Sequence, residues 1–326
     1  VVFGMGPALI SFMVGWVCFS FGEGAYFVPW SEAVAGAVGR KCGQFLGVYG
    51  LVESLGTLFA GAVVYAVGRA GSIGTYSGFF WMFVLGSIGL LVTVPVMRRV
   101  KHYDDIMYRA KSQMKARPDS STHNQDESIL KSVKRILSVP SRGFKAFLGA
   151  ELLSMGVYLM APFILLYGQH ELGLTARVTS LSVWAEMAGI SLGCVLAGWF
   201  AARFGSKAIV KLTCISSAAV PIFVLLIGIL QISVSTQLKG IFVMLSMMFL
   251  GVFHGSSWVG CTGYIVEKAQ EAERPTILGA LNFLMLPFLC LGPIGGLTVK
   301  YIGYTPVFVV AMVFTLISAS LSLKVT

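Results

Sequence analysis

Charged residues are scarce in this sequence. Asp, Glu, Lys and Arg together make up 12% of its 326 residues, whereas a soluble domain carries roughly twice that fraction. So few charges cannot cover a surface that faces water, and the chain is therefore expected to fold in lipid. The sequence also lacks any Cys-x-x-Cys pair and any cysteine grouped with histidine at metal-ligand spacing. Neither a zinc site nor a disulfide framework is therefore implied, and no cofactor is expected.

Long apolar runs take the place of the missing charges. A helix that crosses the hydrocarbon needs about 20 apolar residues, and lipid offers a backbone no hydrogen-bond partner outside its own helix. The runs do not alternate as the strands of a membrane barrel would. We therefore predict an all-α, multi-pass integral membrane protein with nine transmembrane helices. They are 3–30, 44–67, 75–97, 144–167, 176–202, 208–230, 237–262, 276–299 and 304–324.

The cations that give the chain its net charge of +10 lie between the apolar runs. This pattern fits the positive-inside rule and does not indicate a nucleic-acid partner. Loops after odd-numbered spans, with the C-terminus, hold 20 of the 24 Lys and Arg residues, so we predict that they are cytoplasmic and that the protein lies in the plasma membrane. On this assignment Val1 is outside the cell without a charged leader. We therefore expect an odd number of spans upstream of it.

Two distant stretches of the sequence share a pattern. Residues 22–50 and 255–282 each have a glycine late in a span, a mixed segment with a basic residue (Arg40 or Arg274), and Leu-Gly at the start of the next span. Spans one to three therefore resemble spans seven to nine, and the repeat unit has six spans. Three spans of the first unit are then missing at the N-terminus, and we expect a complete protein of twelve.

Two parallel six-span halves joined by a long basic loop resemble the major facilitator superfamily (MFS) of secondary transporters. That family carries the loop motif Gly-x-x-x-Asp-Arg-x-Gly-Arg-Lys, and the stretch "GWFAARFGSK" is similar to it through Gly198, Arg203, Gly205 and Lys207. Ala202 stands where the motif has Asp. The resemblance implies that this loop changes its helix contacts during gating. An ordinary membrane-anchoring basic turn is the alternative.

The resemblance also implies the domain organisation, that of an MFS-type helical bundle. Residues 1–97 would be the remaining three helices of the N-terminal half, and residues 144–326 the six helices of the C-terminal half. Residues 98–143 would form the cytoplasmic loop between the halves. Within it, residues 116–128 are polar and without aromatics, which is typical of disorder. Residues 129–139 predict a short amphipathic helix on the lipid surface.

Acids inside the predicted spans are the first candidates for a functional site, because a charge in hydrocarbon is costly and usually faces a cavity or a partner. Burial favours the protonated form of a carboxyl group, so such an acid can load and release a proton. Glu186 lies near the middle of its span, with Ser182 and Gly189 on the same helical face. The alternative is that each acid pairs with a basic residue on a missing span. The four acids are Glu23, Glu53, Glu151 and Glu186.

Other side chains in the predicted spans suit a solute cavity. His254 is the only histidine within a span, where it would be either a proton relay or a hydrogen-bonded structural residue. Tyr26, Tyr158, Trp258 and Asn282 could line a cavity, with the aromatic belt or helix packing as the alternative. Pro29, Pro162, Pro287 and Pro293 are expected kink sites.

The function that these patterns favour is secondary active transport. We predict a monomer in the lipid bilayer that moves a small organic solute by alternating access, coupled to protons. One alternative is an MFS-fold sensor that binds its ligand without flux. The other is a membrane-embedded enzyme, but the sequence has no His-Glu-x-x-His and no phosphate-binding Gly-Lys loop.

Overall fold

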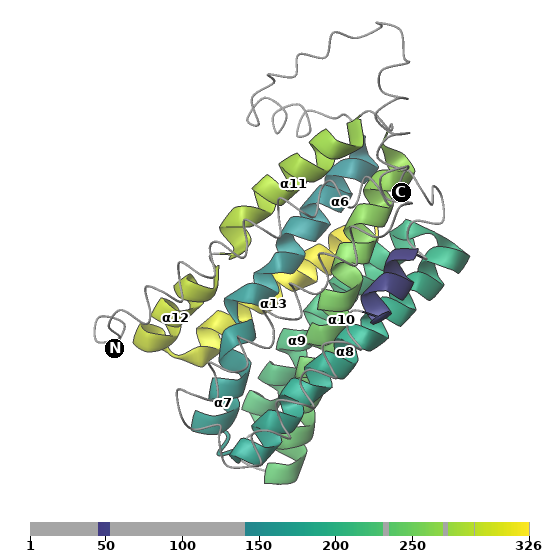
Figure 1. Ribbon diagram of the computed structural model, residues 1–326. Helices are drawn as coiled ribbons and strands as arrows, with labels where there is room; N and C mark the ends of the chain where they lie inside the picture. Colours follow the sequence, from purple (N-terminus) through teal and green to yellow (C-terminus); the bar gives the residue numbers. More distant parts are fainter. Residues whose placement is uncertain (1–44, 53–140, 231–234, 270–272, 290, 326) are drawn as a thin grey trace, which may run out of the picture.

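The computed structural model describes residues 45–52, 141–230, 235–269, 273–289 and 291–325, and every regular element in these ranges is helical (Figure 1). A short helix at 45–52 is the described part of the predicted first three spans, whose other residues lie outside the described ranges, as does the predicted helix at 129–139. The elements that follow are α6 (Arg142–Ser154), the 3₁₀ helices η4 (Met155–Leu159) and η5 (Ala161–Phe163), α7 (Ile164–His170), α8 (Ala176–Phe204), α9 (Ser206–Leu230), α10 (Thr236–Lys268), α11 (Arg274–Leu289), α12 (Leu291–Ile302) and α13 (Tyr304–Ser322).

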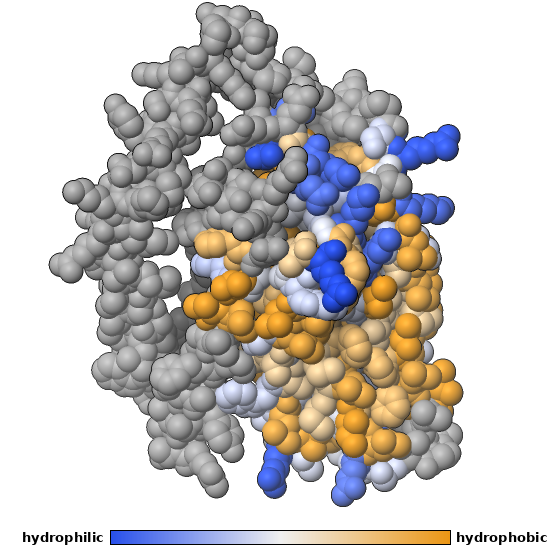
Figure 2. Space-filling model, turned by 90° about the vertical axis from the view of Figure 1, so that its right-hand side faces the viewer, coloured by the Kyte–Doolittle hydropathy of each residue, from blue (hydrophilic) through white to orange (hydrophobic). Residues whose placement is uncertain are grey.

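Six stretches of the described chain are long and apolar enough to cross a membrane. They confirm the six predicted spans between residues 144 and 324, with shifted ends. In Figure 2 apolar side chains form a broad band, and hydrophilic ones gather toward its upper and lower ends. The spans are Arg142–His170, Arg177–Phe204, Ser206–Ile229, Thr236–Lys268, Thr276–Ile302 and Tyr304–Ser322.

The first of these spans is not one continuous helix. It passes from α6 through η4 and η5 into α7, and Pro162, which has no N–H to donate, lies in η5. The interruption lies where the sequence predicts a kink. Gly156 in η4 packs directly on α13, since a Cβ added there would lie 2.6 Å from the Cβ of Phe314. Pro221 also lies inside a helix, α9, and was not among the predicted kink sites.

Helices α8 and α10 lie side by side with their backbones in direct contact (Figure 1). Each carries two glycines four residues apart, Gly189 and Gly193 on α8 and Gly251 and Gly255 on α10. A Cβ added to Gly193 would lie 2.6 Å from the carbonyl oxygen of Val252, and one added to Gly251 would collide with the carbonyl oxygen of Glu186. Small residues at this spacing let membrane helices approach closely, and van der Waals packing then holds them together.

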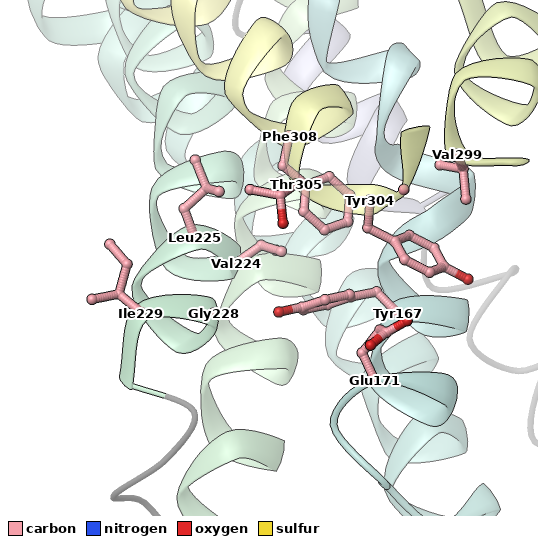
Figure 3. A pocket seen from close by; sticks show the side chains of 11 residues that line it. Tyr167, Glu171, Val224, Leu225, Gly228, Ile229, Val299, Tyr304, Thr305 and Phe308 are labelled. Carbon is pink, nitrogen blue, oxygen red and sulfur yellow. The ribbon is translucent and has the colours of Figure 1, made fainter. Parts of the chain in front are cut away.

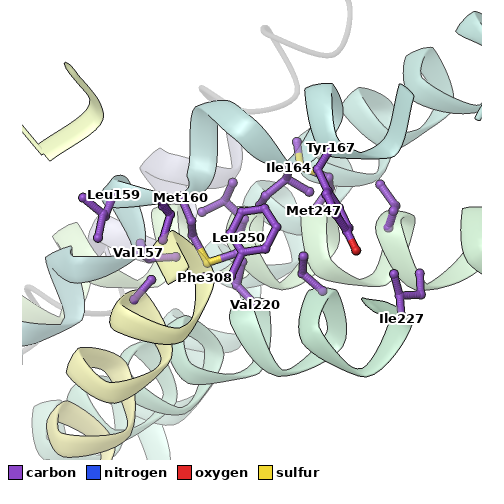
Figure 4. Close-up of a cluster of buried hydrophobic side chains, with 14 of the residues drawn as sticks. Val157, Leu159, Met160, Ile164, Tyr167, Val220, Ile227, Met247, Leu250 and Phe308 are labelled. Atoms are coloured by element: carbon purple, nitrogen blue, oxygen red, sulfur yellow. The ribbon is translucent and has the colours of Figure 1, made fainter. Parts of the chain in front are cut away.

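A cluster of buried apolar side chains joins the other elements around this pair (Figure 4). Phe308 of α13 is 1% exposed and packs among side chains of η4, α9 and α10. Because lipid tails are as apolar as these side chains, the cluster stabilises the bundle by close packing more than by removal from water. Its fully buried members include Val157, Met160, Ile164, Val220 and Phe253.

The turn between α8 and α9 is held by a residue from a third helix. Gly205 has φ 77°, a left-handed conformation that other residues rarely adopt, so the chain reverses within one residue. Glu267, in the last turn of α10, then accepts hydrogen bonds from the backbone N–H of Ser206 at 3.2 Å and from the Ser206 hydroxyl. A carboxylate at a helix N-terminus also meets the positive end of the helix dipole. We call this the Ser206 end of the bundle.

The close contact of α8 and α10 at their glycines, which we call the glycine contact, makes a prediction about stability. A glycine-to-alanine substitution should have opposite effects at two sites. Gly251→Ala forces a methyl group into the backbone of α8, so we expect it to destabilise the protein by about 1–3 kcal/mol. Gly279→Ala on α11 adds its methyl group in open space and should stabilise by about 0.4–1 kcal/mol through the unfolded chain. Thermal unfolding in a mild detergent measures both. Equal midpoints for the two variants would contradict the contact.

The cap on α9 predicts that Ser206→Ala lowers stability. The substitution removes one donor from the Glu267 carboxylate, and we expect a loss of about 1–2 kcal/mol. Ser320→Ala is the matched control, because the Ser320 hydroxyl donates only to its own helix on an exposed face, where a loss within about 0.5 kcal/mol is usual. Chemical unfolding in detergent compares them. If Ser206→Ala were no worse than the control, the cap would have no stabilising role.

Candidate functional site

Glu186 and His254 meet across the glycine contact between α8 and α10. The Nδ1 atom of His254 lies 3.3 Å from Oε1 of Glu186, and the two side chains are 27% and 17% exposed respectively. Both belong to the spans described above. Because Gly251 rests against the backbone of Glu186 itself, the helices are close enough for these side chains to pair. The sequence predicts both residues as candidates, and the structure brings them together.

Aromatic rings lie against His254 and one helical turn beyond it. Tyr158 of η4 stacks on the His254 ring, with the ring centroids 5.7 Å apart and the planes 18° from parallel. Trp258 follows His254 by one turn of α10, and its ring lies 5.9 Å from that of Tyr49 in the helix at 45–52. Four elements of the chain, α8, α10, η4 and the helix at 45–52, therefore contribute to one site. We call these five residues the pair site.

A carboxylate and an imidazole in contact can share one proton. With a proton on either partner the pair has no net charge, and without it the site carries one negative charge. A net charge within a membrane span is costly, so the proton content of the pair changes the energy of the whole helix bundle. The second ring nitrogen of His254, Nε2, is buried and has no hydrogen-bond partner among the residues that the structure describes.

The structure does not bring Glu151 to this site. Glu151 lies on α6, fully buried, and neither carboxyl oxygen has a hydrogen-bond partner within the described part of the chain. Its electrostatic neighbours are the thiols of Cys214 and Cys261. Asn282 is half-buried on α11, and the described residues offer its side chain no hydrogen bond to the pair. The candidates Glu23, Glu53 and Tyr26 lie outside the described residues.

The residues of the loop motif lie at the Ser206 end. Gly198 packs against the helix at 45–52, where a Cβ added to Gly47 would lie 2.6 Å from the Gly198 Cα. The Arg203 guanidinium lies over the rings of Trp199 and Phe204, at 5.9 and 5.8 Å from their centroids. Lys207 is half-buried in the first turn of α9. Gly198 thus contacts a helix of the first part of the chain, while Arg203 binds aromatic rings on its own helix.

Sequence reasoning missed the feature that forms the site. The spacing Gly189-x-x-x-Gly193 and Gly251-x-x-x-Gly255 is a signal for close helix packing in membranes, and it identifies α8 and α10 as neighbours. The acceptor role of Glu267 also went unpredicted, because its donor Ser206 is 61 residues away. Within the described ranges, no three His, Cys, Asp or Glu side chains come together in a way that could hold a metal ion.

Comparison with known proteins agrees with the membrane architecture. No curated protein matches the chain. The family model described as Major Facilitator Superfamily matches residues 1–286, which is most of the 326 residues and includes the pair site and the loop motif. The chain therefore belongs to the major facilitator superfamily, a family of membrane transporters that are not, in general, enzymes.

Proposed function

We propose that this protein moves a small organic solute across the membrane by alternating access, with the transport coupled to protons. The contact between Glu186 and His254 supports the coupling, since it joins a carboxylate and an imidazole at 3.3 Å inside two neighbouring spans. Imidazole is the side chain whose ordinary titration lies closest to physiological pH. When the site changes the membrane face to which it opens, a proton bound to this pair is carried with it.

The cost of net charge in the membrane explains how the pair would couple two fluxes. When the pair holds its proton it is neutral overall, and the bundle can change conformation without moving a charge through hydrocarbon. When the proton has left, the negative charge opposes that movement. A solute that binds with the proton, or replaces it with a positive charge, restores the balance. Movement of the bundle then depends on what the pair site holds.

The solute surface that we propose is aromatic with one polar contact. The Tyr158 ring stacks on His254, and Trp258, one helical turn further along α10, packs against Tyr49. The polar contact is the pair of Glu186 and His254. Pockets for small molecules commonly combine apolar or aromatic walls with a few placed polar groups. Tyr49 and Gly47 bring the helix at 45–52 to this region, which supports a site between two parts of the chain that move relative to each other.

We further infer that the Ser206 end faces the cytoplasm and that the protein lies in the plasma membrane, with a cytoplasmic C-terminus. Basic side chains favour the cytoplasmic ends of spans, and they are unequally divided between the two ends of the described bundle. Those at or near the Ser206 end are Arg142, Lys145, Arg203, Lys207, Lys211, Lys268, Arg274 and Lys324, and those toward the opposite end are Arg177, Lys239 and Lys300.

Proton coupling predicts a pH change inside vesicles when a transported solute is added. Full-length protein reconstituted with a pH-sensitive dye inside is screened against pools of small organic solutes. For a pool that gives a signal, Glu186→Gln and His254→Gln should each reduce the proton flux at least tenfold, because each removes one partner of the proton-binding pair. Glu273→Gln, a carboxylate substitution just before α11 at the Ser206 end, should leave it intact.

Two outcomes would count against this proposal. Solute flux that ignores an imposed pH gradient, and is equal in the wild type and Glu186→Gln, would exclude coupling through the pair. Solute binding by the full-length protein without any flux would exclude transport and favour a sensor.

Protease access tests the orientation. A green fluorescent protein fused after Thr326 should be protected from protease added to intact cells and digested once the cells are permeabilised. A short cleavable tag inserted after Gly173, in the turn between α7 and α8, should show the opposite behaviour. Gly173 is exposed, and a Cβ added to it would meet no atom within 4 Å. The turn therefore accommodates an insertion. Cleavage of the fusion protein in intact cells would reverse the inferred orientation.

A further inference from the structure

A cavity lies at the end of the bundle opposite the Ser206 end. It has a volume of about 480 Å³ and lies among α7, α9, α12 and α13 (Figure 3). This volume is within the range of about 300–1,000 Å³ that is usual for small-molecule sites. None of the residues of the pair site lines it, so the two sites are separate.

Tyr167 places a hydroxyl group in this cavity from a buried ring. The residue is 7% exposed, and its ring lies 5.1 Å from that of Phe308 and 5.5 Å from that of Tyr304. A Cβ added to Gly228 of α9 would lie 3.1 Å from the Tyr167 hydroxyl oxygen, so the glycine leaves room for this group. The hydroxyl forms no hydrogen bond with any residue that the structure describes. A buried tyrosine hydroxyl usually has a partner, which here would be a molecule in the cavity.

Thr305 adds a second hydroxyl group to the cavity. It is the second residue of α13, so no carbonyl oxygen of its own helix lies one turn before it. Thr298 on α12 does have such an acceptor and donates to Ile294 at 3.0 Å, whereas the Thr305 hydroxyl has no hydrogen bond within the described part of the chain. Figure 3 shows the hydroxyl groups of Tyr167 and Thr305 facing the same space beside α9. The cavity therefore offers two donors to one ligand.

The remaining walls are apolar and lie at the end of the membrane spans. Val224 is buried in the wall, and Ile229 at the rim is 78% exposed. Ile229 is the last residue of its span, and Tyr304 and Thr305 are the first two residues of theirs. The cavity thus lies at the level where lipid headgroups meet the hydrocarbon. At this depth a bilayer lipid has the ester groups that join its acyl chains to glycerol.

We propose that this cavity binds a glycerolipid of the bilayer through one of its ester groups. The ester carbonyl oxygen accepts hydrogen bonds from Tyr167 and Thr305, and the acyl chain lies along Val224 and Ile229. An ester accepts hydrogen bonds but donates none, which matches two hydroxyl donors in an apolar wall. Glu171 also borders the cavity but has an interaction partner of its own, and we assign its charge no part in binding. The proposal is independent of the function proposed for the pair site.

The experiment offers the full-length protein two lipids that differ only in the ester group. Protein in a mild detergent is incubated with equal amounts of a diester phosphatidylcholine and the diether analogue with the same headgroup and chains, which has no carbonyl oxygen. Native mass spectrometry counts the lipids of each kind that stay bound. The test variants are Tyr167→Phe and Thr305→Val, which each remove one hydroxyl group and keep the shape of the side chain, and Gly228→Leu, which fills the space.

The wild type should retain the diester lipid at least tenfold better than the diether. Tyr167→Phe and Thr305→Val should each lower this preference by about three- to tenfold, the size expected for one neutral hydrogen bond. Gly228→Leu should lose the preferentially bound lipid altogether, because its side chain occupies the space beside the Tyr167 hydroxyl.

Three matched variants should keep the preference of the wild type. Tyr301→Phe removes a hydroxyl group from a residue that is 75% exposed and does not line the cavity. Thr298→Val removes a hydroxyl group that is bonded within its own helix, and Gly279→Leu adds a side chain where no atom lies within 4 Å of the new Cβ. The proposal is overturned if the wild type retains both lipids equally, as it would if water alone met the two hydroxyl groups. It is also overturned if any of the three test variants behaves as the wild type does.

Discussion

The direct contact of the α8 and α10 backbones is the constraint on which the candidate site depends. In lipid, apolar side chains gain little from meeting one another, so helices are held by close packing and by polar contacts between them. Gly189, Gly193, Gly251 and Gly255 permit that packing because each places a bare Cα against the backbone of the other helix. The Glu186 carbonyl oxygen is one of the atoms in contact. The spacing of the helices and the geometry of the pair at Glu186 therefore cannot vary independently.

The contact in the pair site therefore depends on the relative position of α8 and α10. A small separation or rotation of α8 relative to α10 would break a contact of 3.3 Å between Glu186 and His254, and the change in charge would follow the change in packing. Tyr158 adds a second connection, because it stacks on His254 from the interrupted helix that contains Pro162. An interruption of this kind is where a membrane helix bends most readily. Bending of the first described span would thus act on the His254 ring.

The sequence predicts the described spans, but it does not predict which of them pack against each other. Apolar runs of about 20 residues are a local property, so the six described spans were found, and Glu186 and His254 were found because polar residues are conspicuous inside such runs. The end of α10 was placed at 262 and lies at Lys268, because Tyr264, Ile265 and Val266 are buried by neighbouring helices that composition does not show. Glu186 and His254 are 68 residues apart in the sequence. Their contact depends on how α8 and α10 are rotated relative to each other, which no local pattern predicts.

The acids that the structure describes differ in the groups that contact their carboxyl groups. The Glu267 carboxyl group accepts hydrogen bonds from the N–H and the hydroxyl of Ser206. It therefore holds the turn between α8 and α9. Glu151 is enclosed, and the described part of the chain offers its carboxyl group neither a cation nor a hydrogen-bond donor. Among the acids within the described spans, Glu186 is the one whose carboxyl group contacts an imidazole, that of His254. A carboxylate that can share a proton with such a partner changes charge without being left alone in the membrane, and the glycine contact supplies that partner.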